Sequence, residues 1–384
     1  MLLESIQCSS LHIPFNATFS HASADRASTE TLWVEVRSTG GVAGFGEGCP
    51  RAYVTSESMD SAARFFSAHA REWLETIHDL PTLQEWGNTH RIAIDSNPAA
   101  WSAVELALLD VIGRHEKKTV EALLGKPELA GNFHYTAVLG DASPRRFEGQ
   151  LNHYLQAGFS SFKIKLSGDA ERDLAKVRSL SAAGISPNAV RADANNLWCD
   201  PDVAIAALST LDYPFWAVEE PLSAGDYEGM CRLAVAAKTR IILDESLLRL
   251  DQLDRLTGTA DTWIINLRVS KMGGLLRAIA LIGEARRRGV RIIVGAHVGE
   301  TSLLTRAGLI AAGVAGDFLI AQEGAFGTHL LAADVVDPSI MFGKGGVLDS
   351  TRINIDTNGF GLVIDGASLQ EKSITTVLQT ISIK

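Results

Sequence analysis

The sequence predicts an α/β protein built on a parallel βα barrel, with an α+β region before it. Short β-rich apolar runs alternate with amphipathic helical stretches from about residue 132 to residue 324. No GxGxxG motif follows the first of these strands, as it does in dinucleotide-binding open sheets. A polar residue closes nearly every strand, at intervals of 24 to 29 positions. These observations favour a barrel over an open doubly wound sheet, because the carboxyl ends of barrel strands converge on one mouth.

The predicted strands are short, apolar and rich in β-branched residues, as strands of a parallel sheet usually are. A helix is expected after each strand except the last. Between the second and third strands, for example, Leu174, Val177 and Leu180 recur at helical spacing, and Gly184 supplies a stop. The eight predicted strands cover residues 133–140, 161–166, 189–195, 214–221, 240–246, 262–271, 291–298 and 317–324.

The chain divides into three regions by pattern. Residues 1–125 begin with alternating segments typical of antiparallel strands and continue with amphipathic helices from residue 56, which predicts an α+β domain. Residues 126–325 hold the barrel repeat. Residues 326–384 contain two short strand-like runs, VLDS and FGLVI, and are expected to return to the first domain.

Composition narrows the functional class. The chain has 384 residues, 46% of them hydrophobic, and a formal net charge of −10. An acidic chain without a basic block is a poor partner for nucleic acid or an anionic membrane, and no apolar run reaches the roughly 18 residues of a membrane helix. The N-terminus lacks the features of a signal peptide, and four widely spaced cysteines indicate reduced thiols. We therefore expect a cytoplasmic protein that acts on a small molecule.

Three acidic residues end three neighbouring strands. Asp193, Glu219 and Asp244 close the third, fourth and fifth strands. Three bare carboxylates would repel one another strongly in a low-dielectric site, and a divalent cation relieves that repulsion. Ligands that are all oxygen atoms suit Mg²⁺. The sequence therefore predicts one Mg²⁺ ion at the mouth of the barrel.

Strand parity decides between adjacent acidic residues. Of Glu219 and Glu220 only one can face inward, and Glu220 precedes Pro221, so Glu219 is preferred on the strand itself. Asp244 competes with Glu245 in the same way. An inward Asp193 also brings Asn195 inward, which makes Asn195 a candidate for substrate binding.

The second strand, SSFKIKLSG, carries two lysines on one face. Phe162, Ile164 and Leu166 share one side of the strand, so Lys163 and Lys165 share the other and point into the barrel beside the three carboxylates. Two neighbouring ammonium groups lower each other's pKa, and partial desolvation adds to the effect. We expect Lys165, nearer the mouth, to act as a general base, and Lys163 to tune it or to contact an anionic substrate.

The sixth strand lies across the barrel from the second. In WIINLRVSK the apolar residues alternate outward, so Asn266, Arg268 and Ser270 are expected inward. Parity places Arg268 opposite Lys165. Lys271 directly precedes Met272 and two glycines, where the strand turns into its helix, and it too is a candidate for the pocket.

A cation, a lysine base and an opposing positive charge around one pocket predict a particular chemistry. A small carboxylate substrate would bind the cation through its carboxylate, and Lys165 would remove the proton from the adjacent carbon. The enediolate that forms carries two negative charges, so the cation and the nearby positive side chains must remove most of the barrier electrostatically.

With these motifs assembled, the sequence resembles the enolase superfamily, and most closely the branch of muconate cycloisomerase and mandelate racemase. Proton abstraction by lysine with Mg²⁺ is that superfamily's known pattern. The resemblance implies a (β/α)₇β barrel, an α+β capping domain and an isomerase (racemase, cycloisomerase) or lyase (dehydratase) activity. The matching motifs are GFGEGCPRAYVTSES at 44–58, KIK at 163–165, DAN at 193–195, VEEP at 218–221, LDES at 243–246 and KMGG at 271–274.

The resemblance also implies how a substrate is selected. Loops of the capping domain would close over the mouth, here about residues 14–26 and 49–57. His21, Arg51 and Tyr53 are then candidate specificity residues. Since oligomers are common in this family, the resemblance implies a homo-oligomer as well.

This sequence departs from the family pattern on three strands. Relatives with two catalytic lysines carry the second one five residues before the Gly-Gly pair, where this chain has Arg268, a very weak base. One-base outcomes, such as elimination of water, ring closure or epimerisation with an unusual partner, are therefore expected. His297 on the seventh strand is a candidate for proton transfer, substrate binding or a structural role, and Glu300 is expected to bond within the same loop. Glu323 on the eighth strand is expected to contact the substrate or, through water, the metal.

One further departure concerns the substrate, and two alternative functions are considered. The paired aspartates typical of dipeptide epimerases are missing from 321–324, which argues against a substrate recognised through its ammonium group. A barrel aldolase would use Lys165 or Lys271 as a Schiff base, yet it would not need three carboxylates. A non-catalytic relative kept for binding would be expected to lose the catalytic residues, and they are present.

Overall fold

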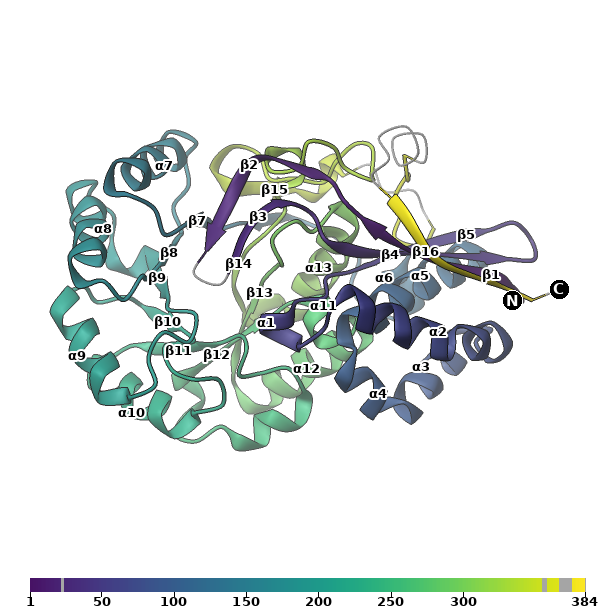
Figure 1. The fold of residues 1–384 in the computed structure, drawn as a ribbon, viewed down its shortest axis with the longest axis horizontal. Helices are drawn as coiled ribbons and strands as arrows, with labels where there is room; N and C mark the ends of the chain where they lie inside the picture. Colours follow the sequence, from purple (N-terminus) through teal and green to yellow (C-terminus); the bar gives the residue numbers. More distant parts are fainter. Residues whose placement is uncertain (22–23, 354–357, 366–374, 384) are drawn as a thin grey trace.

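Eight parallel strands form the centre of the molecule in the computed structural model (Figure 1), which describes residues 1–21, 24–353, 358–365 and 375–383. The strands are neighbours in chain order, and a bridge between Tyr135 and Gln322 links the first strand region to the last. The sheet is therefore closed like a barrel, as predicted. Its strands are β7 (Ala137–Leu139), β8 (Phe162–Lys165), β9 (Val190–Asp193), β10 (Ala217–Glu219), β11 (Arg240–Leu243), β12 (Trp263–Leu267), β13 (Arg291–Val294) and β14 (Leu319–Gln322).

Helices connect most of these strands on the outside of the barrel. Between β11 and β12, however, the described chain has only 3₁₀ turns at Leu250–Arg255 and Ala260–Thr262. Gly258 adopts a positive φ of 75° between them, and this glycine-containing link interrupts any longer helix. The α-helices of the barrel are α7 (Pro144–Gln156), α8 (Ala170–Ala182), α9 (Pro201–Leu211), α10 (Tyr227–Ala237), α11 (Val269–Met272), α12 (Leu275–Arg288) and α13 (Ser302–Ala315).

All eight predicted strands are shorter than expected, and two of them give way to another strand or helix. Residues 133–140 divide between β7 and β6 (Asn132–His134), which pairs antiparallel with β15 (Val347–Asp349). The sixth strand ends at Leu267, because α11 begins there and is closed by Gly273 in a left-handed conformation. Ser270 therefore lies on α11, where its hydroxyl accepts a hydrogen bond from the Cys49 amide at 2.8 Å.

The interior of the barrel is apolar at one end and charged at the other. Ala217, Ile242, Ile264 and Ile293 form a small core of their own inside the strands. The next inward position on β10 is Glu219, and on β12 it is Asn266, whose side-chain amide donates to Glu219 at 2.9 Å. The charged residues thus lie at the carboxyl ends of the strands, and a packed apolar layer lies directly below them inside the barrel.

The capping domain is built on a four-stranded antiparallel sheet with the order β16-β1-β4-β5. Since β16 pairs with β1, the end of the chain joins its beginning, while the exact domain limits stay a prediction. The strands are β1 (Leu3–Leu11), β4 (Thr31–Ser38), β5 (Ala43–Gly48) and β16 (Thr375–Ser382), and a separate hairpin contains β2 (Pro14–His21) and β3 (Ala24–Ser28). The helices are α1 (Ala52–Thr55), α2 (Met59–Thr76), α3 (Leu80–Thr89), α4 (Arg91–Ser96), α5 (Pro98–Glu116) and α6 (Val120–Leu123).

Alternate glycines on β5 allow helix α5 to lie directly against the sheet. A Cβ atom at Gly46 would stand 1.9 Å from the carbonyl oxygen of Ala103. Gly44 and Gly48 meet Ala107 and Ala99 in the same way, at 2.4 and 2.0 Å. The motif GFGEG therefore serves close packing between strand and helix. None of the described helices is both long and apolar enough to cross a membrane.

Candidate active site

Lys163 occupies the centre of the charged site. Its Nζ atom lies 2.8 Å from Asp193, 2.8 Å from Glu219 and 3.2 Å from Glu323, and its side chain is 2% exposed. Burial works against its charge, yet these three carboxylates prevail and hold the pKa of Lys163 above its usual range. The prediction that the neighbouring lysine lowers this pKa is therefore wrong, because the carboxylates lie closer and outnumber it.

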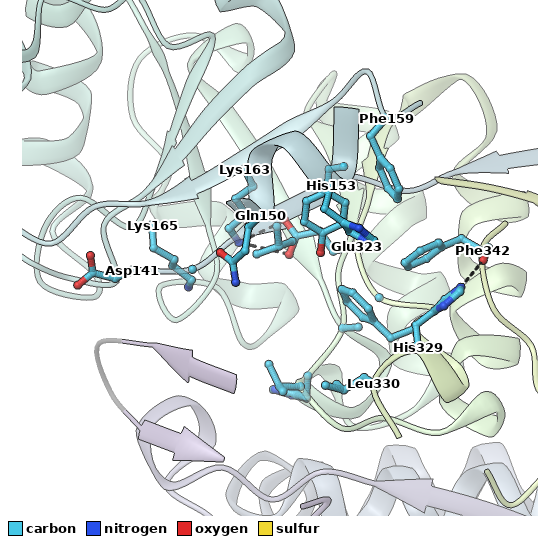
Figure 2. Close-up of a pocket in the computed structure, with 18 of the residues that line it drawn as sticks. Asp141, Gln150, His153, Phe159, Lys163, Lys165, Glu323, His329, Leu330 and Phe342 are labelled. Carbon is cyan, nitrogen blue, oxygen red and sulfur yellow. Dashed lines mark hydrogen bonds and ion pairs between the residues drawn. The ribbon is translucent and has the colours of Figure 1, made fainter. Parts of the chain in front are cut away.

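Lys165 lies at the edge of the same cluster and faces the cavity (Figure 2). Its ammonium group donates to Asp193 Oδ2 and to Asn195 Oδ1, both at 2.7 Å. The side chain is 12% exposed, whereas that of Lys163 is 2% exposed. Both lysines line the cavity, and Lys165 is the more exposed of the two to a substrate there.

The register of the sheet brings Asp193 and Glu219 side by side, since they are paired residues on β9 and β10. Although burial opposes it, the ammonium groups of Lys163 and Lys165 hold the pKa of Asp193 below its usual range. Burial, followed by the charge of Asp193, raises the pKa of Glu219 to about 7. Negative charge is thus under-compensated at Glu219.

Asp244 is held mainly by two cations. Lys271 Nζ lies 2.8 Å from its Oδ1, and Arg268 Nη2 forms a close ion pair with its Oδ2. Burial works against ionisation, but these cations hold the pKa of Asp244 below its usual range. Lys271 is fully buried and also donates to the carbonyls of Asp244 and Asn266. Lys271 is therefore engaged by these buried oxygens and does not line the cavity.

The carboxylates Asp193, Glu219 and Asp244 fit Mg²⁺ by donor type, burial and charge. All offer oxygen ligands from neighbouring strands, and the raised pKa of Glu219 marks a site that another positive charge would stabilise. Their oxygens do not form one compact cluster among the described residues, because Lys163 lies between Asp193 and Glu219. The three carboxylates therefore do not converge on one point in this structure: Asp193 and Glu219 share the ammonium group of Lys163, whereas Asp244 is paired with Arg268 and Lys271.

The alternatives to Glu219 and Asp244 have different positions. Glu220 is fully buried, and its carboxylate accepts hydrogen bonds from the amides of Asp244 and Ser246, at 2.6 and 2.7 Å. It holds the loop after β11, in agreement with the choice of Glu219 as the inward residue. Glu245 does line the cavity, and burial followed by the charge of Asp244 raises its pKa well above the usual range. Sequence reasoning weighed Glu245 against Asp244, but strand parity excludes neither, because both lie beyond Leu243, where β11 ends.

Arg268 and His297 lie together across the cavity from Lys165. Arg268 Nη1 is 3.2 Å from His297 Nδ1, and both side chains line the cavity. Burial opposes the charge of Arg268, but Asp244 and Glu219 hold its pKa above the usual range. Arg268 is thus a permanent cation at this place, as the sequence predicted. Glu300 bonds within its own loop, where it accepts from the His297 amide at 2.7 Å.

Glu323 lines the cavity but is already engaged. Its carboxylate lies 2.6 Å from Arg191 and 3.2 Å from Lys163. These cations prevail over burial and lower the pKa of Glu323 to about 2. Arg191, which the sequence analysis did not single out, shares the inward parity of Asp193 and could have been found from it.

The three candidate residues of the capping domain differ in position. Tyr53 lines the cavity. Arg51 is buried and donates to the carbonyls of Glu30, Pro50 and Val298, so it fastens the capping loop to the barrel instead of facing a substrate. His21 is the last residue of β2, and its side chain lies outside the described part of the structure.

The cavity at the mouth of the barrel measures about 720 Å³. One side is charged and holds the two lysines, while the other side is aromatic (Figure 2). The aromatic side brings together Phe159, Phe342 and His329, whose ring is stacked on Phe342 at 4.8 Å. Sequence analysis missed this side, because its residues come from segments far apart in the chain. Other lining residues that it missed include Asp141, Arg146, Gln150, His153, Tyr154, Phe326 and Lys344.

Comparison with known proteins identifies the family. Residues 146–368 match the model of the enolase C-terminal domain-like family, and the chain belongs to that family. It is 26% identical to a hydrophobic dipeptide epimerase of Enterococcus faecalis over 81% of this chain and 87% of the relative. It is 24% identical to an N-succinyl-L-Arg/Lys racemase of Bacillus cereus over 80% and 83%. A dipeptide epimerase from Cytophaga hutchinsonii, solved with Mg and D-Ala-L-Val, superimposes with a TM-score of 0.85 at 21% identity and covers both chains fully.

These matches confirm the resemblance to the enolase superfamily and the barrel with its capping domain. The chain is therefore an enzyme of that superfamily.

Proposed function

We propose that this enzyme uses Lys165 to remove the α-proton of a small carboxylate and returns a proton to complete an isomerisation, or expels a β-substituent instead. The observation that carries the proposal is the position of Lys165, which is open to the cavity and hydrogen bonded to Asp193, a predicted metal ligand. The relatives named above, an epimerase and a racemase, favour the isomerisation.

Asp193, Glu219 and Asp244 would hold one Mg²⁺ ion, which would bind the substrate carboxylate and acidify the adjacent C–H bond. Lys165 would then accept the proton on one side of the substrate. The ion would compete with Lys165 for the carboxylate of Asp193, which lies 2.7 Å from its Nζ atom, and would free the amine to face the substrate. Lys163 stays positively charged and offsets the charge of Asp193 and Glu219.

Arg268 would act as the opposing cation. It follows β12, which lies four strands away from β8 in the closed sheet of eight, so it faces the opposite side of a bound substrate. An arginine stabilises developing negative charge but does not release its proton readily. Proton exchange is therefore expected on the Lys165 side of the substrate.

The cavity supports a substrate without a free ammonium group. Glu323, on the strand where dipeptide epimerases carry aspartates, is paired with Arg191 and Lys163. Phe159 and Phe342 offer apolar contacts at the far side (Figure 2). We therefore propose an N-acylated amino acid or a hydroxyacid with an apolar or aromatic group. A cytoplasmic location and a homo-oligomer remain part of the proposal, supported by the acidic composition and the family resemblance.

The test is incubation with N-acyl amino acids and hydroxyacids in deuterium oxide with Mg²⁺. Mass spectrometry would report α-deuteration, and proton NMR would report inversion or loss of water. The Schiff-base aldolase gains no support from the relatives named here. It predicts borohydride trapping of Lys165 or Lys271 with a carbonyl substrate, and trapping without α-deuteration would overturn our proposal.

A further inference from the structure

We propose that the capping domain carries a site for a transition-metal ion of the Zn²⁺ class, formed by His69, Glu72 and His90. One potential ligand atom from each residue lies within 4.8 Å of the other two. The site is separate from the barrel mouth, and the proposal does not rest on the reaction proposed above.

The spacing of these atoms suits ligands around one ion. His69 and Glu72 lie one turn apart on α2, and His69 Nδ1 is 3.4 Å from Glu72 Oε2. His90 occupies the junction of α3 and α4, and its Nε2 is 3.5 Å from Glu72 Oε1. Nitrogen and oxygen ligands about 2.0–2.2 Å from a tetrahedral Zn²⁺ stand about 3.4 Å apart. The two separations involve different oxygen atoms of Glu72, so each histidine lies about one ligand-to-ligand distance from the carboxylate, and the three residues are close enough to surround one ion.

The orientation of His90 gives independent support. Its Nδ1 is 3.1 Å from the carbonyl oxygen of Trp86, which can only accept, so Nδ1 carries a proton. In the neutral ring Nε2 then presents a lone pair to the carboxylate of Glu72, another acceptor. The ring is also stacked on Trp86 at 4.0 Å and 10°. A histidine supported at one nitrogen by a carbonyl, with the other nitrogen directed at a second ligand, is typical of metal sites.

The site is accessible and its donors select the class of ion. The side chains are 22% (His69), 40% (Glu72) and 25% (His90) exposed, so an ion can enter and keep a water as its fourth ligand. Imidazole and carboxylate ligands suit Zn²⁺, Co²⁺ or Ni²⁺ better than Mg²⁺. A bound ion would tie α2 to the junction of α3 and α4.

The experiment titrates the full chain with Co²⁺ in excess Mg²⁺, which keeps the barrel carboxylates occupied. We expect about one Co²⁺ per chain, with the visible absorption of a tetrahedral complex that Zn²⁺ displaces, and a higher melting temperature with Zn²⁺. Loss of a supporting residue already weakens metal sites by about 10–100-fold. His90→Ala and Glu72→Gln should each weaken binding at least that much.

Matched controls separate this site from others. His115, an exposed histidine on α5, should be replaceable by alanine without effect, and Asp193→Asn should keep the cobalt spectrum. Glu72→Gln preserves size and helix propensity, so it tests Glu72 as a metal ligand even if His90→Ala fails to fold. Absence of binding in the wild type, or unchanged binding in Glu72→Gln, would overturn the proposal and leave a simple ion-pair cluster.

Discussion

Arg268 donates a hydrogen bond to Nδ1 of His297 across 3.2 Å. Since a guanidinium group can only donate, Nδ1 must be the acceptor and the ring proton resides on Nε2. His297 is therefore poised to donate from Nε2, and its Nδ1 is not free to accept a proton from substrate. This arrangement leaves Lys165 as the base on the opposite side of the cavity and leads to the first two predictions.

Replacement of Lys165 should abolish α-proton exchange. Lys165→Ala removes the amine that faces the cavity, and general-base groups contribute about 10²- to 10⁴-fold to rates. We expect deuterium incorporation to fall by that factor while circular dichroism stays native. Lys118→Ala, an exposed lysine on the capping domain, is the matched control. Exchange at the wild-type rate in Lys165→Ala would remove this residue from the mechanism.

Exchange should be faster with one enantiomer of a racemisable substrate than with the other in the wild type. Arg268→Lys introduces an amine that can release its proton and still pair with Asp244. We expect this variant to gain measurable exchange with the other enantiomer, followed by chiral chromatography. Fast exchange of both enantiomers by the wild type would show that a base other than Lys165 acts from the second side.

Removal of Lys163 should destabilise the metal-free protein and increase its response to Mg²⁺. Lys163→Met leaves Asp193 and Glu219 buried without their shared cation, and breaking a buried ion pair costs about 3–5 kcal/mol. Added Mg²⁺ should therefore raise the melting temperature of the variant more than that of the wild type. An equal response of both proteins to Mg²⁺, measured against a chelator, would contradict the assignment of these carboxylates as ligands.

The stability of the enzyme should fall with rising pH through the buried Glu47. Burial raises its pKa to about 8, although the hydroxyl and amide of Thr301 bond to it. The folded state keeps this proton where the unfolded chain, with an ordinary pKa near 4.5, has lost it. The contribution of protonated Glu47 to the free energy of unfolding is therefore fully present below about pH 4.5. It is lost as the pH rises from there to about pH 8.

Glu47→Gln should flatten this pH dependence, since glutamine does not titrate. Urea unfolding at pH 5 and pH 8 would measure the effect as a difference in the free energy of unfolding. If both proteins lose the same stability between these two pH values, Glu47 is not the group responsible.

Close packing of β5 on α5 predicts a large effect at Gly46. A methyl group at Gly46 would overlap the carbonyl of Ala103, so Gly46→Ala should cost about 1–3 kcal/mol or more. Gly283, in the exposed face of α12, has open space around it, and Gly283→Ala should stabilise the protein by up to about 1 kcal/mol. Thermal unfolding of both variants would measure these changes as shifts in melting temperature. An unchanged melting temperature for Gly46→Ala would mean that α5 can move away from β5.

The sequence by itself determined the barrel and the inward residues of its strands. Alternation along a strand is a local rule, and it correctly placed Lys163, Lys165 and Glu219 inside the barrel. The polar strand ends predicted the chemistry, and the motifs around them carried the resemblance to the family. The same rule failed at Ser270, because the strand had already ended and α11 had begun.

Only the tertiary structure decided the charge states and the shape of the cavity. The pKa of Lys163 depends on three carboxylates from three other strands, and no local pattern reports their distances. The aromatic side of the cavity likewise joins residues as distant as Phe159 and Phe342. Electrostatic and packing interactions act through space, whereas sequence patterns describe neighbours along the chain, so these features emerge only when the chain is folded.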